Sequence, residues 1–143
     1  MTATVDGVLD RLRRQDVSVP EPGQLLSIAE TAERTGVSAH TLRYYERIGL
    51  LAVGRDATGR RRYTADDFAR VVFLNRLRLT GMPIRELSRY VALANAGPHT
   101  EPERLAMLLE QRAAVVAQLA ELRRALDTID FKIQTYGGAA GPT

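Results

Sequence analysis

Residues 27–63 read SIAETAERTGVSAHTLRYYERIGLLAVGRDATGRRRY, and this stretch decides the fold of the chain. Ser27 and Glu30 form an S-x-x-E capping box, in which each side chain binds the other residue's backbone N–H at the start of a helix. Gly36 ends this first helix with a positive φ, and Ser38 begins a second short helix. Two short helices joined by a tight turn predict a helix-turn-helix.

A basic hairpin follows the second helix. Gly49 ends that helix, and residues 51–53 and 60–63 are short extended runs on either side of the sequence GRDATG. A turn rich in Gly and Asp between extended runs is typical of a β-hairpin. A hairpin in this position is the wing of a winged helix-turn-helix, which places its second helix in the major groove. The residues therefore predict sequence-directed binding to double-stranded DNA.

Positive charge is concentrated in and just after this motif. Residues 27–90 carry 12 Arg and 7 acidic residues, a net charge of +5, whereas residues 1–26 and 91–143 each carry −1. A phosphate-binding surface requires such a local positive field. Lys132 is the only Lys. A codon bias toward Arg explains the scarcity of Lys as well as function does, but it leaves the clustering unexplained.

The C-terminal part of the chain carries a long apolar repeat. Between residues 105 and 136, ten positions alternate in steps of three and four, and all but Arg112 are apolar or aromatic. This spacing predicts a coiled-coil helix over about residues 101–136. The chain supplies one such helix, so we expect two copies to form a homodimer. The predicted dimerisation residues are Leu108, Val115, Leu119, Leu122, Leu126, Ile129 and Ile133.

The predicted fold class is mainly α, a winged helix-turn-helix followed by the long dimerisation helix. Before the motif, Val5, Val8, Leu9 and Leu12 repeat at helical spacing, which is consistent with a short amphipathic helix and equally with a mobile tail. The predicted domains are an N-terminal extension and linker at 1–26, a DNA-binding domain at 27–96, the dimerisation helix at 97–136 and a disordered tail at 137–143.

Composition argues against several other classes of protein. The chain has no cysteine, which excludes disulfides, thiolate metal sites and thiol redox sensing. No apolar run approaches the roughly 20 residues of a membrane-spanning helix, and the N-terminus lacks the pattern of a signal peptide. We therefore expect a cytoplasmic, nucleoid-associated protein with no membrane partner. With only His40 and His99, and no carboxylate pair or phosphate loop, we expect no enzyme, metal site or cofactor.

The motif resembles the MerR family of bacterial transcription regulators over residues 27–63 and the helices that follow to about residue 94. The family's Thr-x-Arg-Tyr-Tyr-Glu segment and later Gly-Leu stand here as Thr41, Leu42, Arg43, Tyr44, Tyr45, Glu46, Gly49 and Leu50. The family's wing ending, Gly-x-Arg-x-Tyr, stands as Gly59, Arg61 and Tyr63. Arg60 departs from the Tyr often found there, and a Pro common near the start of the wing is missing.

The resemblance implies a homodimer held by an antiparallel coiled coil of the two long helices. It implies a near-palindromic operator in a promoter with an over-long spacer, and an indirect effect on RNA polymerase through distortion of that DNA. The alternative is an architectural, excisionase-like protein that bends DNA without an inducer, against which the long helix argues. A coiled-coil adaptor that binds a partner protein is a further alternative. The effector is not identified by the sequence.

The second helix and the wing carry the predicted DNA contacts. Thr41 and Arg43 are expected at base edges, His40 is a further candidate there, and Ser38 belongs to the same surface. Tyr63 is either a phosphate contact or, in the favoured interpretation, the anchor of the wing. Arg61→Ala is expected to weaken binding to every sequence and to flatten the salt dependence. The residues expected at phosphates are Tyr44, Arg47, Arg60, Arg61 and Arg62.

Two neighbours of these contacts are given structural roles. Tyr45 is predicted to lie in the core, because it shares a helix face with Leu42 and Ile48. Glu46 repels phosphate, so we expect it to form a salt bridge with an Arg of the wing or of an adjacent helix.

Overall fold

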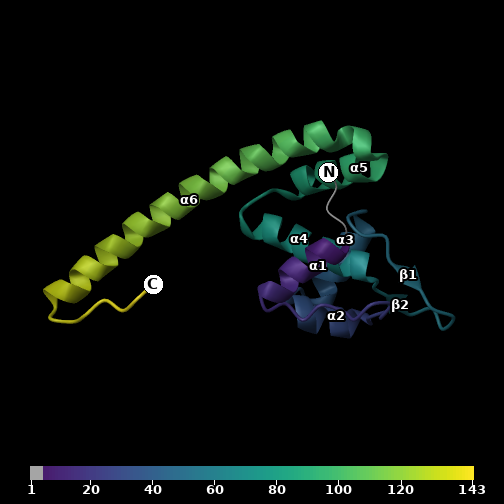
Figure 1. Ribbon diagram of the computed structural model, residues 1–143, viewed down its shortest axis with the longest axis horizontal. Helices are drawn as coiled ribbons and strands as arrows, with labels where there is room; N and C mark the ends of the chain where they lie inside the picture. The colour runs from purple at the N-terminus through teal and green to yellow at the C-terminus, as the bar shows by residue number, and fades with distance from the viewer. Residues whose placement is uncertain (1–4) are drawn as a thin grey trace. The chain divides into compact units, whose positions relative to one another are not determined.

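The computed structural model describes the backbone of residues 5–143 and the side chains of residues 7–143, so residues 1–4 of the predicted extension lie outside the described residues. The chain divides into two compact units, Met1–Asn95 and Ala96–Thr143. Figure 1 shows the elements, which are α1 (Val5–Arg14), α2 (Ile28–Thr35), α3 (Ala39–Arg47), β1 (Gly54–Arg55), β2 (Arg61–Arg62), α4 (Ala65–Leu79), α5 (Ile84–Ala96), the 3₁₀ turn η1 (Pro98–Thr100) and α6 (Glu101–Thr135).

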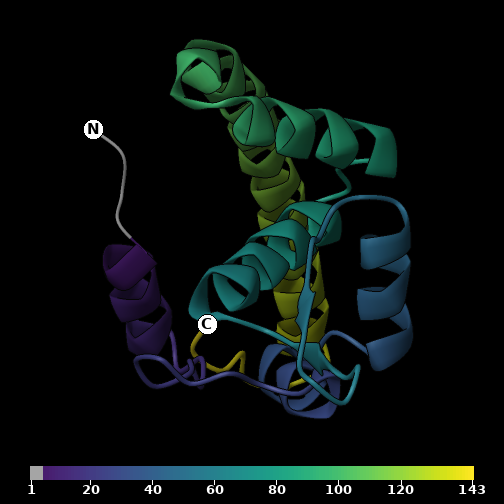
Figure 2. The ribbon, with the colours of Figure 1, turned by 90° about the vertical axis from the view of Figure 1, so that its right-hand side faces the viewer.

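The predicted N-terminal helix is confirmed as α1, which packs on α4 in the first unit. Leu9 and Leu12 of α1 are buried, whereas the side chain of Val5 lies outside the described residues. In Figure 2, α1 (purple) and α3 (blue) lie on opposite sides of α4 (teal). The linker after α1 is bound to α2, because Arg34 Nη1 of that helix donates a hydrogen bond to the carbonyl oxygen of Val19 at 3.3 Å.

The helix-turn-helix forms as its capping residues predict. The Ser27 Oγ accepts from the backbone N–H of Glu30 at 3.1 Å, and the Glu30 carboxylate accepts from the N–H of Ser27 at 3.0 Å. The hydrogen bond from the Ser27 backbone is the main reason that the pKa of Glu30 is lowered. Gly36 ends α2 with φ of 74°, a left-handed conformation that a residue with a Cβ rarely adopts. The chain then reverses at once, and α3 packs on α2.

The wing is present, but its first strand is shifted from the predicted position. The strands pair antiparallel, with Gly54 opposite Arg62 and Arg55 opposite Arg61. Residues 51–53, predicted as extended, form no strand. The backbone N–H groups of Leu50 and Leu51 instead donate to the carbonyl oxygen of Tyr45, at 2.9 and 3.4 Å. These bonds give a hydrogen-bond partner to a carbonyl group in the last turn of α3. Because both Leu side chains are buried in the core, the chain becomes free to pair only from Gly54.

The core of the first unit lies between α4 and the helix-turn-helix. α4 starts with a capping box between Thr64 and Asp67. Leu26 and Tyr63 form an antiparallel bridge, with N···O distances of 2.8 and 2.9 Å, which ties the linker to the base of the wing. The largest fully buried side chains in this core are Tyr45, Tyr63, Phe68, Leu26, Leu42, Leu50, Leu74, Leu87 and Val71.

The second unit consists mainly of the long helix. α6 extends over 35 residues, which confirms the predicted helix to within one residue. α5 of the first unit continues to Ala96, and the 3₁₀ turn η1 leads directly into α6. The Thr100 hydroxyl donates to the carbonyl oxygen of Gly97 at 2.8 Å and accepts from Arg104 Nε at 2.9 Å, which stabilises this turn. Among the described helices, none is long and apolar enough to cross a membrane.

Candidate nucleic-acid interface

One face of α3 is exposed and carries most of the predicted DNA contacts. Leu42 and Tyr45 are fully buried, as predicted for Tyr45, so the opposite side of α3 faces solvent. Arg43 forms no hydrogen bond or ion pair with any residue that the structure describes. The guanidinium of Arg47 lies 5.8 Å from the centre of the Tyr44 ring, which holds both side chains on this face. Spacing of i, i+3, i+4 and i+7 aligns four exposed residues, His40, Arg43, Tyr44 and Arg47.

Ser38 and Thr41, also predicted at the DNA, bind each other at the start of α3. The Ser38 Oγ accepts from the backbone N–H of Thr41 at 3.1 Å and donates to the Thr41 Oγ1 at 3.0 Å. Ser38 is therefore the N-cap of α3. The Thr41 hydroxyl keeps a free donor hydrogen, since the Ser38 contact uses it as an acceptor. Of this pair, Thr41 is the better placed for a base edge.

Glu46 joins α3 to both strands of the wing. Its Oε2 lies 2.5 Å from Arg61 Nε, and its Oε1 lies 3.3 Å from Arg55 Nη2. The predicted salt bridge from Glu46 to the wing is confirmed. Both partners of the shorter bond are about three-quarters buried, with 22% and 25% of the side chains exposed, so water screens this pair less than a surface pair. The bonds orient the wing against α3.

Asp56 organises the turn at the tip of the wing. Its Oδ1 accepts from the Thr58 hydroxyl at 2.6 Å, from the Thr58 N–H at 2.9 Å and from the Arg60 N–H at 3.1 Å. Its Oδ2 accepts from Arg62 Nε at 2.9 Å. These bonds, the Thr58 hydroxyl first, hold the pKa of Asp56 well below its usual range. Gly59 completes the turn with φ of 81°.

Tyr63 is the anchor of the wing. Its side chain is fully buried, as expected for the favoured of its two predicted roles. Burial, and after it the charge of Glu46, raises the pKa of its hydroxyl. Within the described part of the chain, the hydroxyl has no hydrogen-bond partner. A buried hydroxyl without a partner costs stability, on the order of 1–3 kcal/mol.

We expect Tyr63→Phe to leave DNA affinity unchanged and to keep or raise the thermal stability. The ring still fills the core, and the unpartnered oxygen is removed. Melting temperature and DNA affinity, measured by calorimetry and fluorescence anisotropy, check this. Tyr44→Phe is the matched control, because its hydroxyl lies on the exposed face of α3. A loss of affinity in Tyr63→Phe that matches the loss in Tyr44→Phe contradicts the role as an anchor.

The structure therefore divides the basic residues of the wing into two groups. Arg61 and Arg62 are paired with Glu46 and Asp56, whereas the side chain of Arg60 is exposed and its guanidinium has no partner among the described residues. Sequence reasoning missed Asp56 as the organiser of the turn and the second bond to Glu46. The sequence Asp56-Ala-Thr-Gly carried the first signal, since an Asp at the start of a turn binds backbone N–H groups two residues on. The structure brings no group of three or more His, Asp or Glu together for a metal ion within its described range.

The predicted dimerisation residues form a stripe along α6 in the second unit. Leu119, Leu122, Leu126 and Ile129 are exposed, as is Ile133, and Leu108 and Val115 are partly exposed. An exposed apolar stripe on a helix of 35 residues is unusual for a soluble monomer, because the burial of each such side chain away from water lowers the free energy.

Two family models match the chain. Residues 26–93 match the MerR HTH family regulatory protein model, and residues 68–130 match the model described as MerR, DNA binding. The two matches span the helix-turn-helix, the wing, α4, α5 and most of α6. They leave out α1 and the first part of the linker.

Relatives and solved structures agree with these matches. An uncharacterized HTH-type transcriptional regulator of Haemophilus influenzae is 40% identical over 109 residues, which are 76% of this chain and 81% of that protein. HiNmlR, a MerR family regulator lacking the sensor domain, has been solved bound to promoter DNA. It is 38% identical with a TM-score of 0.73, over 80% of this chain and 91% of that one. A putative MerR family regulator of Listeria monocytogenes is 40% identical with a TM-score of 0.71, over 78% of this chain and 86% of that one. The chain thus belongs to the MerR family of DNA-binding transcriptional regulators.

Proposed function

We propose that the protein acts as a homodimer on near-palindromic promoter sites with a long spacer, in the cytoplasm and on the nucleoid. Each copy inserts α3 into the major groove and lays its wing along the backbone. The observation that carries this proposal is the exposed face of α3, with its unpaired Arg43, beside a wing held by Glu46. The related HiNmlR, which was solved bound to promoter DNA, supports it.

Dimerisation is proposed through the α6 stripe, as an antiparallel coiled coil. The proposed domains are an extension at 1–26, a DNA-binding domain at 27–96, a dimerisation helix at 97–136 and a disordered tail at 137–143. A dimer with two-fold symmetry reads two half-sites of opposite direction, which is why a near-palindrome is expected. RNA polymerase is then affected through the shape of the promoter DNA.

The experiment that tests this function is a selection of bound genomic fragments. The purified protein is mixed with sheared DNA from its source genome at physiological salt, and retained fragments are sequenced. Enrichment of a few near-palindromic sites within promoters supports the proposal, and neighbouring genes then suggest what is regulated. Broad enrichment without a common motif contradicts it and favours the architectural DNA-bending alternative.

We expect Arg60→Ala to weaken binding to specific and random DNA by similar factors. Arg60, Arg61 and Arg62 are all predicted at phosphates, and of the three only Arg60 has an exposed guanidinium with no partner among the described residues. The slope of log affinity against log salt is expected to fall by about one unit. Arg14→Ala is the matched control, since it removes one exposed Arg from α1, on the opposite side of α4 from α3. Equal slopes for the two variants would assign the effect to net charge alone.

A further inference from the structure

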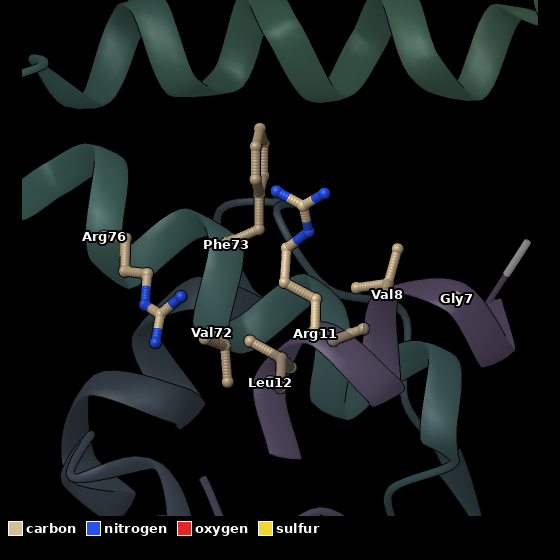
Figure 3. A pocket seen from close by; sticks show the side chains of 8 residues that line it. Gly7, Val8, Arg11, Leu12, Val72, Phe73 and Arg76 are labelled. Carbon is tan, nitrogen blue, oxygen red and sulfur yellow. The ribbon is translucent and has the colours of Figure 1, made fainter. Parts of the chain in front are cut away.

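A hollow of about 420 Å³ lies between α1 and α4 in the first unit. Figure 3 shows the side chains that line it. Their apolar members give it a mostly hydrocarbon surface, and the volume falls within the range of small-molecule sites, about 300–1,000 Å³. The main lining residues are Val8, Arg11 and Leu12 of α1 and Val72, Phe73 and Arg76 of α4.

A neighbouring hollow lies along α4, on the side toward α5. A second hollow of about 210 Å³ shares Val8, Ala69 and Phe73 with the first and reaches Tyr90, Val91 and Ala94. The rings of Phe73 and Tyr90 lie 5.3 Å apart between centroids, so the second hollow has an aromatic wall. Together the two hollows are here named the α1–α4 groove.

The groove has cations at one end, and none of the acidic side chains that the structure describes lines it. Arg11 and Arg76 lie on either side of Phe73 in Figure 3, and neither forms an ion pair with a residue that the structure describes. Among the described residues, Arg76 Nη1 donates to the neutral amide oxygen of Gln15, at 2.5 Å. Asp10 of α1 is 2.7 Å from Arg13 and is absent from the lining.

At the other end, the groove is largely apolar. Arg70 is its one charged residue there, and its Nη1 donates to the side-chain oxygen of Asn95 at 3.3 Å. The groove is therefore amphipathic along its length, with guanidinium groups that have no described acidic partner at one end and hydrocarbon and aromatic surface at the α5 end.

We propose that the α1–α4 groove binds a small amphipathic carboxylate of the class of medium-chain fatty acids. The exposed side chains of Arg11 and Arg76, which lie on either side of Phe73, turn toward the carboxylate and bind it with charge-assisted hydrogen bonds. The hydrocarbon chain passes Phe73 toward Tyr90 and Ala94. The site depends on α1, which lies outside the residues that match the family models, 26–93 and 68–130, so family membership does not supply it. The proposal stands apart from the DNA interface, since α1 and α3 lie on opposite sides of α4.

Titration of the full-length protein with decanoate tests the proposal. Isothermal calorimetry is expected to give a Kd of about 100 µM or tighter. Decanol, which has the same chain without the charge, is expected to bind at least about fivefold more weakly. In ¹⁵N-labelled protein, the largest amide shifts are expected in α1 and along α4 from Ala69 to Arg76.

Variants then test whether decanoate binding depends on the Arg residues that line the groove or only on the net charge of the protein. Arg11→Gln and Arg76→Gln are each expected to weaken decanoate by at least about fivefold. Arg14→Gln, an exposed cation of α1 outside the lining, is expected to change it by less than about twofold. The proposal is overturned if decanoate shows no binding at 1 mM, since a Kd of 1 mM corresponds to a binding free energy of only about −4 kcal/mol. Equal affinity for decanol, or an equal effect of Arg14→Gln, overturns it as well. The comparison of decanoate with decanol uses the wild-type protein, so it decides even if a variant does not fold.

Discussion

Replacement of Leu122 and Ile129 by glutamate is expected to convert the protein from a dimer into a monomer and to abolish tight operator binding. Both residues lie on the exposed stripe of α6. Burial of one Leu or Ile in an interface contributes about 1.5–3 kcal/mol, and two copies place four such side chains there. Each Glu introduces a charge that must be desolvated in the coiled coil, and the substituted copies also repel each other.

Loss of the dimer also removes the linkage between the two α3 helices. A second binding event within one complex raises overall affinity by about 10²–10⁴, so the monomer is expected to lose at least about a hundredfold on a near-palindromic site. Light scattering measures the mass, and fluorescence anisotropy measures the affinity. Ala117→Glu with Thr128→Glu is the matched control, because it adds the same charges at exposed positions of α6 outside the stripe. A Leu122→Glu/Ile129→Glu protein that remains a dimer contradicts the proposed interface.

Arg43→Ala is expected to reduce affinity for the specific site while random DNA is bound nearly as well as before. Arg43 is exposed on α3 and unpaired among the described residues, which leaves its guanidinium free for a guanine edge. One bidentate contact is worth about 1–3 kcal/mol of discrimination, and the dimer makes it twice. The expected loss on the specific site is therefore at least about tenfold, with a relaxed preference at one position of each half-site.

The measurement compares specific and scrambled duplexes at one salt concentration. Arg47→Ala is the control, because Arg47 lies one turn along the same face and is expected at a phosphate. It should weaken both duplexes by similar factors. Arg43→Lys is expected to recover little of the specificity, since an ammonium group lacks the planar fork of Arg. Equal losses for Arg43→Ala on both duplexes contradict its role at a base.

Local sequence signals predicted the elements of the helix-turn-helix well. Ser27 with Glu30, and Thr64 with Asp67, start helices because their side chains reach backbone groups three residues away. Gly36 ends α2 because its missing Cβ permits a positive φ. The prediction failed at residues 51–53, where Leu50 and Leu51 follow the end of α3 into the core. That placement depends on the space left by Tyr45 and its neighbours, which sequence spacing does not report.

The sequence by itself determined which residues are apolar, charged or able to cap a helix, and hence the two short helices, the long α6 and the basic character of the motif. These properties depend on neighbours a few residues apart, so the sequence alone is enough to predict them. Only the tertiary structure decided how the basic residues divide. Glu46 pairs with Arg61, Asp56 pairs with Arg62, and Arg60 stays exposed, although the three Arg residues are adjacent and chemically identical. The tertiary structure alone also placed α1 on α4. Such pairings bring together groups distant along the chain, and only the packing of the core determines which of them meet.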